Sequence, residues 1–207
     1  MATLEAEVRP DRITEYGPGM EKIFVYSPGD PVCYFYRLTE GVIQLCTYPG
    51  ENGNRNLFGI LLPPAFFGVM EVLDGARHFV TCAKAVKDSR VEAFRSIRLP
   101  QILHSNPFFG QPMLADLAGQ MDFAVRLSGI RLGPIRGRIL GLNRQGYLVE
   151  EETSESYRLT QEDLAALLGA TREGISKGLS TLDAEGLYLR GRGNLHFVSR
   201  PKPNHRE

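Results

Sequence analysis

Four polar residues in the C-terminal third of the chain have the types and spacing with which one helix can read DNA. They are Arg172, Glu173, Ser176 and Lys177, and they directly follow Thr171. An arginine can donate two hydrogen bonds to a guanine edge, a glutamate can accept one from cytosine, and a lysine can bind a guanine or a phosphate. This segment is therefore a candidate recognition helix.

These charges have a simpler explanation when they are taken alone. Glu173 and Lys177 are four residues apart and could form an ion pair on a solvated helix face. DNA reading is favoured by the spacing of Ala165 and Gly169, by the basic hairpin that follows with Arg190 and Arg192, and by the hinge upstream. Thr160 and Asp163 have the spacing of a capping box at the start of another helix, and Gly169 offers the sharp turn that would join the two helices. Two helices joined by a tight turn predict a helix-turn-helix.

The residues around this helix pair extend the prediction to a winged helix-turn-helix. Helices are expected over 135–142, 161–168 and 172–185, and strands over 157–159, 187–190 and 195–198. The tetrapeptide Gly191-Arg192-Gly193-Asn194 has the turn chemistry of a hairpin between the last two strands. The candidate DNA contacts are Arg172, Glu173, Ser176, Lys177, Thr171, Thr160, Arg190 and Arg192.

The N-terminal half contains six short apolar or alternating runs that are separated by turn residues. They are 22–26, 34–38, 42–48, 56–62, 80–85 and 90–94. Many short strands between Gly, Pro, Asn and Asp are typical of an antiparallel barrel or a double-sheet jelly roll. The expected fold class is α+β, with an N-terminal antiparallel β-roll, a long helix, and a C-terminal winged helix-turn-helix.

The long helix is expected to end at the pair Gly133-Pro134, because proline lacks a backbone donor and clashes with a preceding helical turn. Four apolar residues within it alternate at spacings of three and four, as in the narrow seam of a helix packed on a partner helix. They are Leu114, Leu117, Met121 and Ala124. We expect this seam to form a homodimer, and the alternative is that it docks on the β-roll of its own chain. The predicted domains are a β-roll sensor domain (1–105), a dimerisation helix (106–133) and a DNA-binding domain (134–207).

Composition excludes a membrane-spanning class. The most apolar stretch, 59–70, is a dozen residues long and contains two prolines, whereas a membrane-spanning helix needs about 20 residues. The first residues lack the basic and apolar segments of a secretion signal, so we expect a cytoplasmic protein without a membrane partner. The 24 basic residues balance 24 acidic ones, but from Thr171 to Arg200 five bases oppose three acids. Positive charge therefore gathers at the candidate DNA-binding end.

Nearly the whole chain resembles the Crp/Fnr family of bacterial transcription regulators. The segment LTQEDLAALLGATREGISKGLSTLDAEGLYLRGRGNLHFV looks like that family's helix-turn-helix and wing, with its Arg-Glu-x-x-x-Arg/Lys signature at Arg172, Glu173 and Lys177. The segment YSPGDPVCYFYRLTEGVIQL resembles the opening of the family's β-roll, and PPAFFGVMEVLDG occupies the place of its ligand-binding turn. The resemblance implies that the β-roll is like a cyclic-nucleotide-binding jelly roll. It also implies a homodimer that binds double-stranded DNA and acts with RNA polymerase as an activator.

One departure from the family is Gly178, which stands where an aliphatic residue usually packs the recognition helix. Gly174 lies one turn earlier. Each glycine is expected to cost about 0.5–1 kcal/mol of helix stability relative to alanine. We therefore expect a loose recognition helix that DNA orders.

Family members that bind cyclic AMP resemble one another in a Gly-Glu pair and an Arg-Ser pair that hold the nucleotide. Here Val69 follows Gly68, and Phe79-Val80 stands where Arg-Ser is expected. A buried phosphate needs a cation or backbone donors to offset its desolvation. We therefore expect no binding of cyclic AMP, and a β-roll without any effector is an equal possibility.

The turn Phe67-Gly68-Val69-Met70 resembles instead that of the cyanobacterial global nitrogen regulator, which senses 2-oxoglutarate. That regulator has an Arg and a Glu on its long helix, where this chain has Gln120 and Val125, and Arg77 could serve as another anchor for a carboxylate. The candidate effector-pocket residues are Phe67, Gly68, Val69, Met70, Arg77, Gln120 and Val125.

No cofactor and no metal site are expected. The four histidines share no ligand spacing, and the three cysteines are expected to be buried, inert thiols. Two other classes of function stay open. One is a β-barrel enzyme, for which Glu71, Asp74 and His78 form the nearest group of titratable residues but lack a supporting arrangement. The other is a ligand-binding adaptor whose winged helix contacts protein.

Overall fold

The computed structural model describes residues 8–48, 55–149, 153, 156–186 and 195–198. Contacts divide the chain into two compact units, residues 1–44 with 63–121 and residues 45–62 with 122–207. This division differs from the predicted boundaries after 105 and 133, because the strand over 56–61 and the C-terminal part of the long helix fall in the second unit. No helix in the described ranges is long and apolar enough to cross a membrane.

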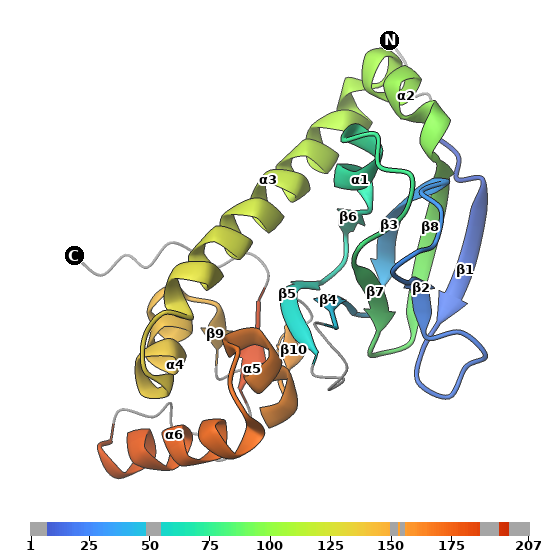
Figure 1. Ribbon diagram of the computed structural model, residues 1–207. Coiled ribbons are helices and arrows are strands. Elements are labelled where there is room, and N and C mark those ends of the chain that lie inside the picture. Colours follow the sequence, from blue (N-terminus) through green and yellow to red (C-terminus); the bar gives the residue numbers. More distant parts are fainter. Residues whose placement is uncertain (1–7, 49–54, 150–152, 154–155, 187–194, 199–207) are drawn as a thin grey trace. The chain divides into compact units, whose positions relative to one another are not determined.

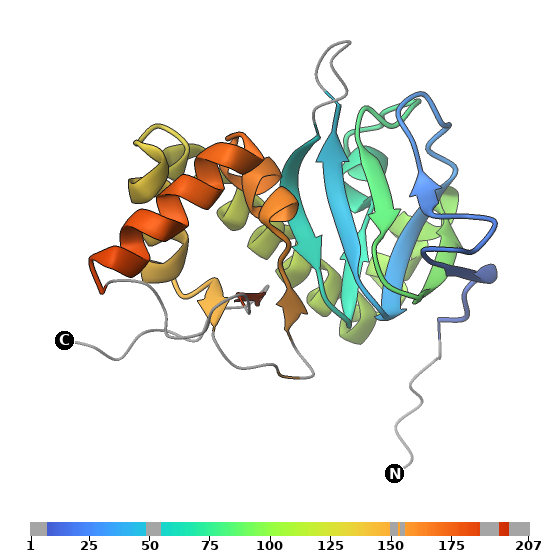
Figure 2. The same cartoon turned by 90° about the horizontal axis from the view of Figure 1, so that it is seen from below.

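Eight antiparallel strands form the predicted β-roll (Figures 1 and 2). They are β1 (Arg12–Tyr16), β2 (Phe24–Tyr26), β3 (Tyr34–Glu40), β4 (Ile43–Thr47), β5 (Asn56–Leu61), β6 (Ala65–Phe67), β7 (Cys82–Ala85) and β8 (Ser89–Arg95). One four-stranded sheet has the order β1-β8-β3-β6, and the other has the order β2-β7-β4-β5. In the first sheet Tyr36 pairs with both Ala93 and Phe67, so β3 lies between β8 and the short edge strand β6.

Three short helices accompany the roll: α1 (Val69–Leu73), η1 (Ser96–Arg98) and α2 (Leu99–Ser105). Of these, α1 and α2 contribute to a core cluster of the first unit, where apolar side chains from strands and helices bury one another. The members of this core are Phe35, Phe66, Val69, Phe94, Leu99, Ile102 and Met113. Val69, the residue after the predicted ligand-binding turn, is thus a core residue.

The long helix α3 (Pro107–Ile130) is followed by α4 (Ile135–Arg144), and Pro134 is the N-cap between them, with extended backbone. The second unit continues with β9 (Leu148–Val149), β10 (Tyr157–Arg158), α5 (Gln161–Leu168), α6 (Arg172–Ala184) and β11 (His196–Phe197). The three strands form a sheet of order β10-β11-β9. Its core includes Phe123, Tyr147 and Phe197, with the ring centroids of Phe123 and Tyr147 4.8 Å apart.

The α+β fold class is confirmed, and every predicted strand run of the roll contains a strand. The structure adds β1, β6, β9 and three short helices that the sequence patterns did not indicate. The predicted strand over 187–190 lies outside the described residues. The predicted strand over 195–198 is β11, and it pairs with both β9 and β10.

Gly174 and Gly178 lie where α4 crosses α6 at close range. A Cβ atom at Gly174 would be 2.7 Å from Ile135 Cδ1, and one at Gly178 would be 3.0 Å from Ile135 Cγ2 and 3.1 Å from Ile139 Cδ1. Larger side chains would force the two helices apart, since packed interiors leave little free space. The two glycines thus permit α4 to pack closely on α6. This packing role was not part of the expectation that α6 is loose.

Candidate nucleic-acid interface

The helix pair α5–α6 begins with two well-formed N-caps. Thr160 Oγ1 accepts a hydrogen bond from the Asp163 N–H at 3.0 Å, and Asp163 Oδ2 accepts one from the Thr160 N–H at 3.1 Å. The predicted capping box is therefore present. Thr171 Oγ1 accepts from the Gly174 N–H at 3.1 Å, and Gly169 adopts the left-handed backbone, with φ of 60°, that the turn between the helices requires.

The outer face of α6 carries the four polar residues that were proposed to read DNA. Arg172, Glu173, Ser176 and Lys177 are all exposed. Ile175 and Leu182 on the opposite face are buried, which fixes the helix with its polar side outward. The structure therefore places the candidate base-reading residues together on one accessible surface.

The ion pairs on this surface are weak enough to rearrange on binding. Lys177 Nζ lies 3.0 Å from Glu173 Oε1, and Arg172 Nη1 lies 3.7 Å from Glu162 Oε1. All four side chains are about 70–80% exposed, and pairs of this kind contribute about 0–1 kcal/mol. The same residues can therefore form these solvated ion pairs in the free protein and still be available to contact DNA.

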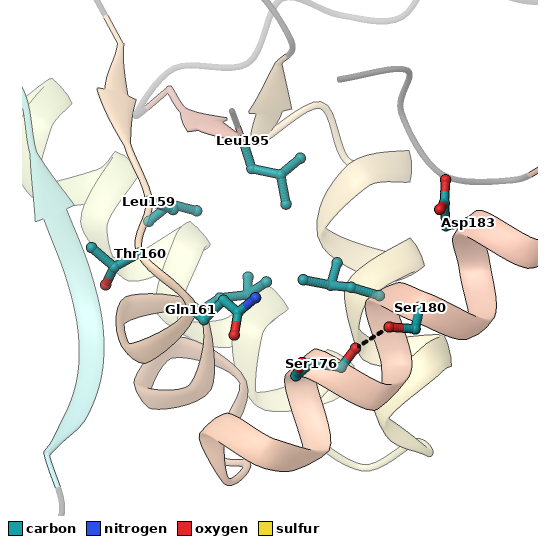
Figure 3. Close-up of a pocket in the computed structure, with 9 residues that line it drawn as sticks. Leu159, Thr160, Gln161, Ser176, Ser180, Asp183 and Leu195 are labelled. Carbon is teal, nitrogen blue, oxygen red and sulfur yellow. Dashed lines mark hydrogen bonds between the residues drawn. The ribbon is translucent and has the colours of Figure 1, made fainter. Parts of the chain in front are cut away.

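A cavity of about 200 Å³ lies beside the outer face of α6. Four leucines contribute its apolar lining: Leu159, Leu164, Leu179 and Leu195. Figure 3 shows Ser176 and Ser180 of α6 on one side of the cavity and Thr160 and Gln161 on another. Polar groups from the start of α5 and from α6 thus line the same cavity.

Three of the predicted contacts either have a structural role or lie outside the described residues. The Thr160 hydroxyl, besides capping α5, donates to Asp163 Oδ2 at 2.8 Å, so it is engaged within the chain. Arg190 and Arg192 of the predicted wing lie outside the described residues.

Asp163 anchors the first helix of the pair to β5. Its Oδ1 accepts from Arg55 Nη2 at 2.7 Å, and its Oδ2 accepts from the Tyr157 hydroxyl at 3.1 Å. The side chains of Arg55 and Asp163 are only 19% and 5% exposed. Burial, together with the Asp163 charge, raises the pKa of Tyr157, so its hydroxyl stays a donor.

We expect Asp163→Ala to lower the free energy of unfolding by about 3–5 kcal/mol, because it removes one partner of a buried ion pair and the capping box together. Urea denaturation measures this change. Glu162→Ala is the matched control, since Glu162 precedes it and is exposed, and it should stay within about 0.5 kcal/mol of the parent. Equal effects of the two substitutions would contradict an anchoring role for Asp163.

The candidate effector residues differ in their exposure. Phe67 and Val69 are buried in the core, whereas Met70 is 49% exposed and Arg77 is exposed. Gly68 lies between them with a φ of 68°. The positive φ explains why glycine stands in this turn, but the side chains around it point to different environments.

Gln120 and Val125 also differ in environment. Five residues rotate a helix by about 140°, so the two side chains lie on different faces of α3. Gln120 Nε2 donates to the Phe66 carbonyl at 2.7 Å, and Asp116 Oδ2 accepts from the Phe66 N–H at 3.0 Å. Val125 is 71% exposed. The helix thus holds the strand before the turn through Asp116 and Gln120, and sequence reasoning missed this role of Asp116.

Aromatic side chains pack beneath the predicted ligand-binding turn. Phe79 stacks on Tyr26 with ring centroids 3.8 Å apart, and Tyr36 stacks on Phe67 at 5.3 Å. Burial raises the pKa of both tyrosines, so they are neutral at physiological pH. Phe79 is buried while the next residue, Val80, is 76% exposed. This arrangement offers apolar rings where a cyclic phosphate would need a cation.

The four predicted seam residues of α3 differ in exposure. Leu114 and Met121 are half exposed, whereas Leu117 and Ala124 are partly buried. Val125 continues the exposed row, since it follows Met121 by four residues. Its exposure differs from that of Phe67 and Val69 in the predicted effector pocket, which are buried.

The cysteines differ from the expectation of three buried thiols. Cys46 and Cys82 are buried and disulfide-bonded, whereas Cys33 is a free and exposed thiol. Within the described ranges, no group of three His, Cys, Asp or Glu side chains could hold a metal ion.

Comparison with known proteins finds matches to both halves of the chain. The family model described as a cyclic nucleotide-binding domain matches residues 21–106, and the one described as a Crp-like helix-turn-helix domain matches residues 137–202. The transcriptional regulator SdrP of Thermus thermophilus is 29% identical over 164 residues, which cover 79% of this chain and 78% of that protein. The cyclic AMP receptor protein of the same organism is 27% identical over 184 residues, covering 83% and 81%.

A solved structure shares the fold. The c-di-GMP-responsive global regulator CLP of Xanthomonas campestris superimposes with a TM-score of 0.71, covering 90% of this chain and 93% of its own, at 18% identity. At such a low sequence identity, the likeness shows a shared fold alone.

Proposed function

This chain belongs to the Crp/Fnr family of DNA-binding transcriptional regulators, and we propose that it is a homodimer that reads palindromic promoter sites through α6 without cyclic AMP. Its relatives are regulators and not enzymes, so the enzyme alternative is excluded. The observation that carries the proposal is the exposed outer face of α6, which presents Arg172, Ser176 and Lys177 together just after the Thr171 cap.

The reading step follows from the geometry of α6. Its N-terminal amides carry partial positive charge, which favours the approach of a phosphate and fixes the helix in the major groove. Arg172 then leaves its weak pair with Glu162 and donates two hydrogen bonds to a guanine. Glu173 accepts from a cytosine amine, and Lys177 binds a guanine edge or a phosphate.

Dimerisation doubles this reading. The exposed row of α3 supplies an apolar surface for a second copy, and two α6 helices would then meet half-sites about one helical turn, or 34 Å, apart. A regulator of this kind acts in the cytoplasm, and we propose that it recruits RNA polymerase as an activator.

The aromatic packing under the turn supports activity without cyclic AMP. One relative is named for cyclic AMP, but here Val69 is buried in the core and Phe79 stacks on Tyr26. Desolvating a phosphate beside these rings would be costly without a compensating cation. The alternative effector, 2-oxoglutarate, finds little support, because Arg77 is exposed and Gln120 is engaged with Phe66.

We therefore expect isothermal titration with cyclic AMP to show no specific binding to the full-length protein. The thermal unfolding temperature should also stay unchanged, because a ligand that does not bind the folded state cannot stabilise it. A micromolar dissociation constant would overturn this prediction and would mean that another group supplies the cation.

Gel-shift titration against genomic fragments at two salt concentrations tests the proposed function. A DNA-binding regulator should shift a subset of fragments, with an affinity that falls steeply as salt rises, because binding releases counterions from the phosphates. An adaptor whose helix-turn-helix contacts protein would shift no fragment at either concentration, and that outcome would reject the proposal.

A further inference from the structure

The carbonyl groups at the C-terminal end of α5 are unusually well satisfied. The last four carbonyls of a helix lack partners within the helix and need other donors. The Ala165 carbonyl accepts from the backbone N–H groups of Gly169 and Ala170. Side chains of two arginines bind the following carbonyls, from Ala166 to Gly169.

Arg131, which follows α3, binds the first two of these carbonyls. Its Nε donates to the Leu167 carbonyl at 2.7 Å, and its Nη2 donates to the Ala166 carbonyl at 3.3 Å. The same Nη2 also donates to the Leu57 carbonyl of β5. Arg131 therefore joins α5 to β5.

Arg138 of α4 binds the next two carbonyls, at the end of α5 and in the turn that follows it. Its Nη1 donates to the carbonyls of Leu168 and Gly169 at 2.8 and 2.9 Å, and its Nε donates to the Gly133 carbonyl at 2.6 Å. The planar guanidinium thus links the start of α4 to the turn between the two reading helices. The single ammonium of a lysine cannot reproduce this set of fixed directions.

The two guanidinium groups are kept close together despite their like charges. Burial and the neighbouring Arg138 lower the pKa of Arg131. An arginine nevertheless stays protonated in proteins, and the negative end of the α5 dipole stabilises both charges. Side-chain atoms of both also lie about 4 Å from the Cβ position of Gly169, so they enclose the turn itself.

We infer that Arg131 and Arg138 are positioning residues for base reading, which hold the turn after α5 so that α6 begins at a fixed place. Thr171 and Arg172 follow this turn within three residues of Gly169. A small displacement of the turn would therefore move the Arg172 guanidinium away from the geometry of a bidentate base contact. The inference rests on the proposed DNA binding, and it adds two residues that would set sequence preference without touching a base.

Two other roles for Arg138 would give different results. A phosphate contact depends on charge, so lysine would preserve it, and its loss would lower the slope of affinity against salt by about one unit. A contribution to folding alone would lower the unfolding temperature and leave the order of base preferences unchanged. If Arg138 positions the reading helix, its loss should reduce the preference for particular bases, and a lysine at this position should not restore that preference.

The experiment compares Arg138→Lys and Arg138→Gln with the matched controls Arg126→Lys and Arg126→Gln. Arg126 is an exposed arginine of α3 that pairs with Asp122 four residues away. For each full-length protein, the affinity for an operator, for all its single-base variants and for unrelated DNA is measured at several salt concentrations. Both Arg138 variants should lose about tenfold or more in the ratio of operator to unrelated affinity, with an unchanged salt slope. The Arg126 variants should match the parent.

A double-mutant cycle with Arg172→Ala identifies the route of the effect. If Arg138 acts by placing Arg172, then Arg138→Lys should cause little further loss of preference once Arg172 is alanine. Full additivity would overturn the inference, as would restoration of preference by lysine, a reduced salt slope, or an unchanged preference profile.

Hydrogen exchange supplies a test that does not depend on DNA. The Ala170 and Gly174 amides, which are bonded to the Ala165 carbonyl and to Thr171 Oγ1, should exchange faster in Arg138→Lys and Arg131→Lys than in Arg126→Lys. Unchanged exchange in the lysine variants would refute the positioning role, whatever the parent protein does with DNA. A parent protein without sequence preference would reject the proposed function, and the exchange result would still decide whether the two arginines hold the turn.

Discussion

Replacing Arg172 by alanine should weaken operator binding by about 1–3 kcal/mol for each half-site, because it removes a bidentate contact with a base. For a dimer on two half-sites the loss corresponds to about 30-fold to 10⁴-fold in affinity. The preference at one G·C pair of each half-site should relax at the same time. Competition binding across single-base operator variants measures both effects.

The contrasting variant is Arg192→Ala, in the predicted wing. A hairpin arginine is expected to meet phosphate, so its loss should weaken all sequences alike and reduce the salt slope by about one unit. The two variants should therefore differ in kind as well as in size. If Arg172→Ala keeps the base-preference profile and Arg192→Ala reshapes it, the assignment of the reading helix is wrong.

Replacing Leu114 and Met121 together by glutamate should convert the dimer into monomers. Both side chains are about half exposed in the single chain, so the fold should tolerate the substitutions. In a dimer they would bring four like charges into an apolar interface, where desolvation is costly. Sedimentation at micromolar concentration should give the 23.1 kDa mass of one chain for the variant and twice that mass for the parent.

Ala115→Glu is the control for this prediction. Ala115 is exposed on another face of α3, near the charged pair Asp122 and Arg126, so the control should remain dimeric. A parent protein that sediments as a monomer would refute dimerisation through this row. A variant that stays dimeric would move the interface elsewhere.

Much of the fold could be predicted because its signals are local. The cap at Thr160, the turn at Gly169 and the break at Pro134 depend on residues only a few positions apart, and all three appear where they were expected. The longer strands of the roll were also predictable, since each is bounded by turn residues.

The elements that were missed depend on distant partners. β6 has only three residues and follows two prolines, and it exists because it pairs with Tyr36–Leu38 of β3. Gly174 and Gly178 gained a role only when Ile135 and Ile139 were placed against them. No periodicity of the sequence reveals such contacts between separated segments.

In the candidate site, too, some residues could be predicted from local sequence patterns and others depend on distant contacts. The exposed face of α6 follows from helical spacing, so its four polar residues could be chosen in advance. Arg131 and Arg138 bind backbone carbonyls more than 25 residues away, and a carbonyl carries no sequence signal. For the effector turn, resemblance indicated its location, but only the structure showed that Phe67 and Val69 are buried in the core and that Val125 is exposed on α3.

Selection of binding sites from a random DNA library by the full-length protein, with no small molecule added, tests the central claim most directly. The account predicts enrichment of one palindrome whose half-sites lie about one helical turn apart, and loss of the G·C preference in the same selection with Arg172→Ala. Absence of any enriched sequence, or enrichment only after cyclic AMP is added, would contradict it.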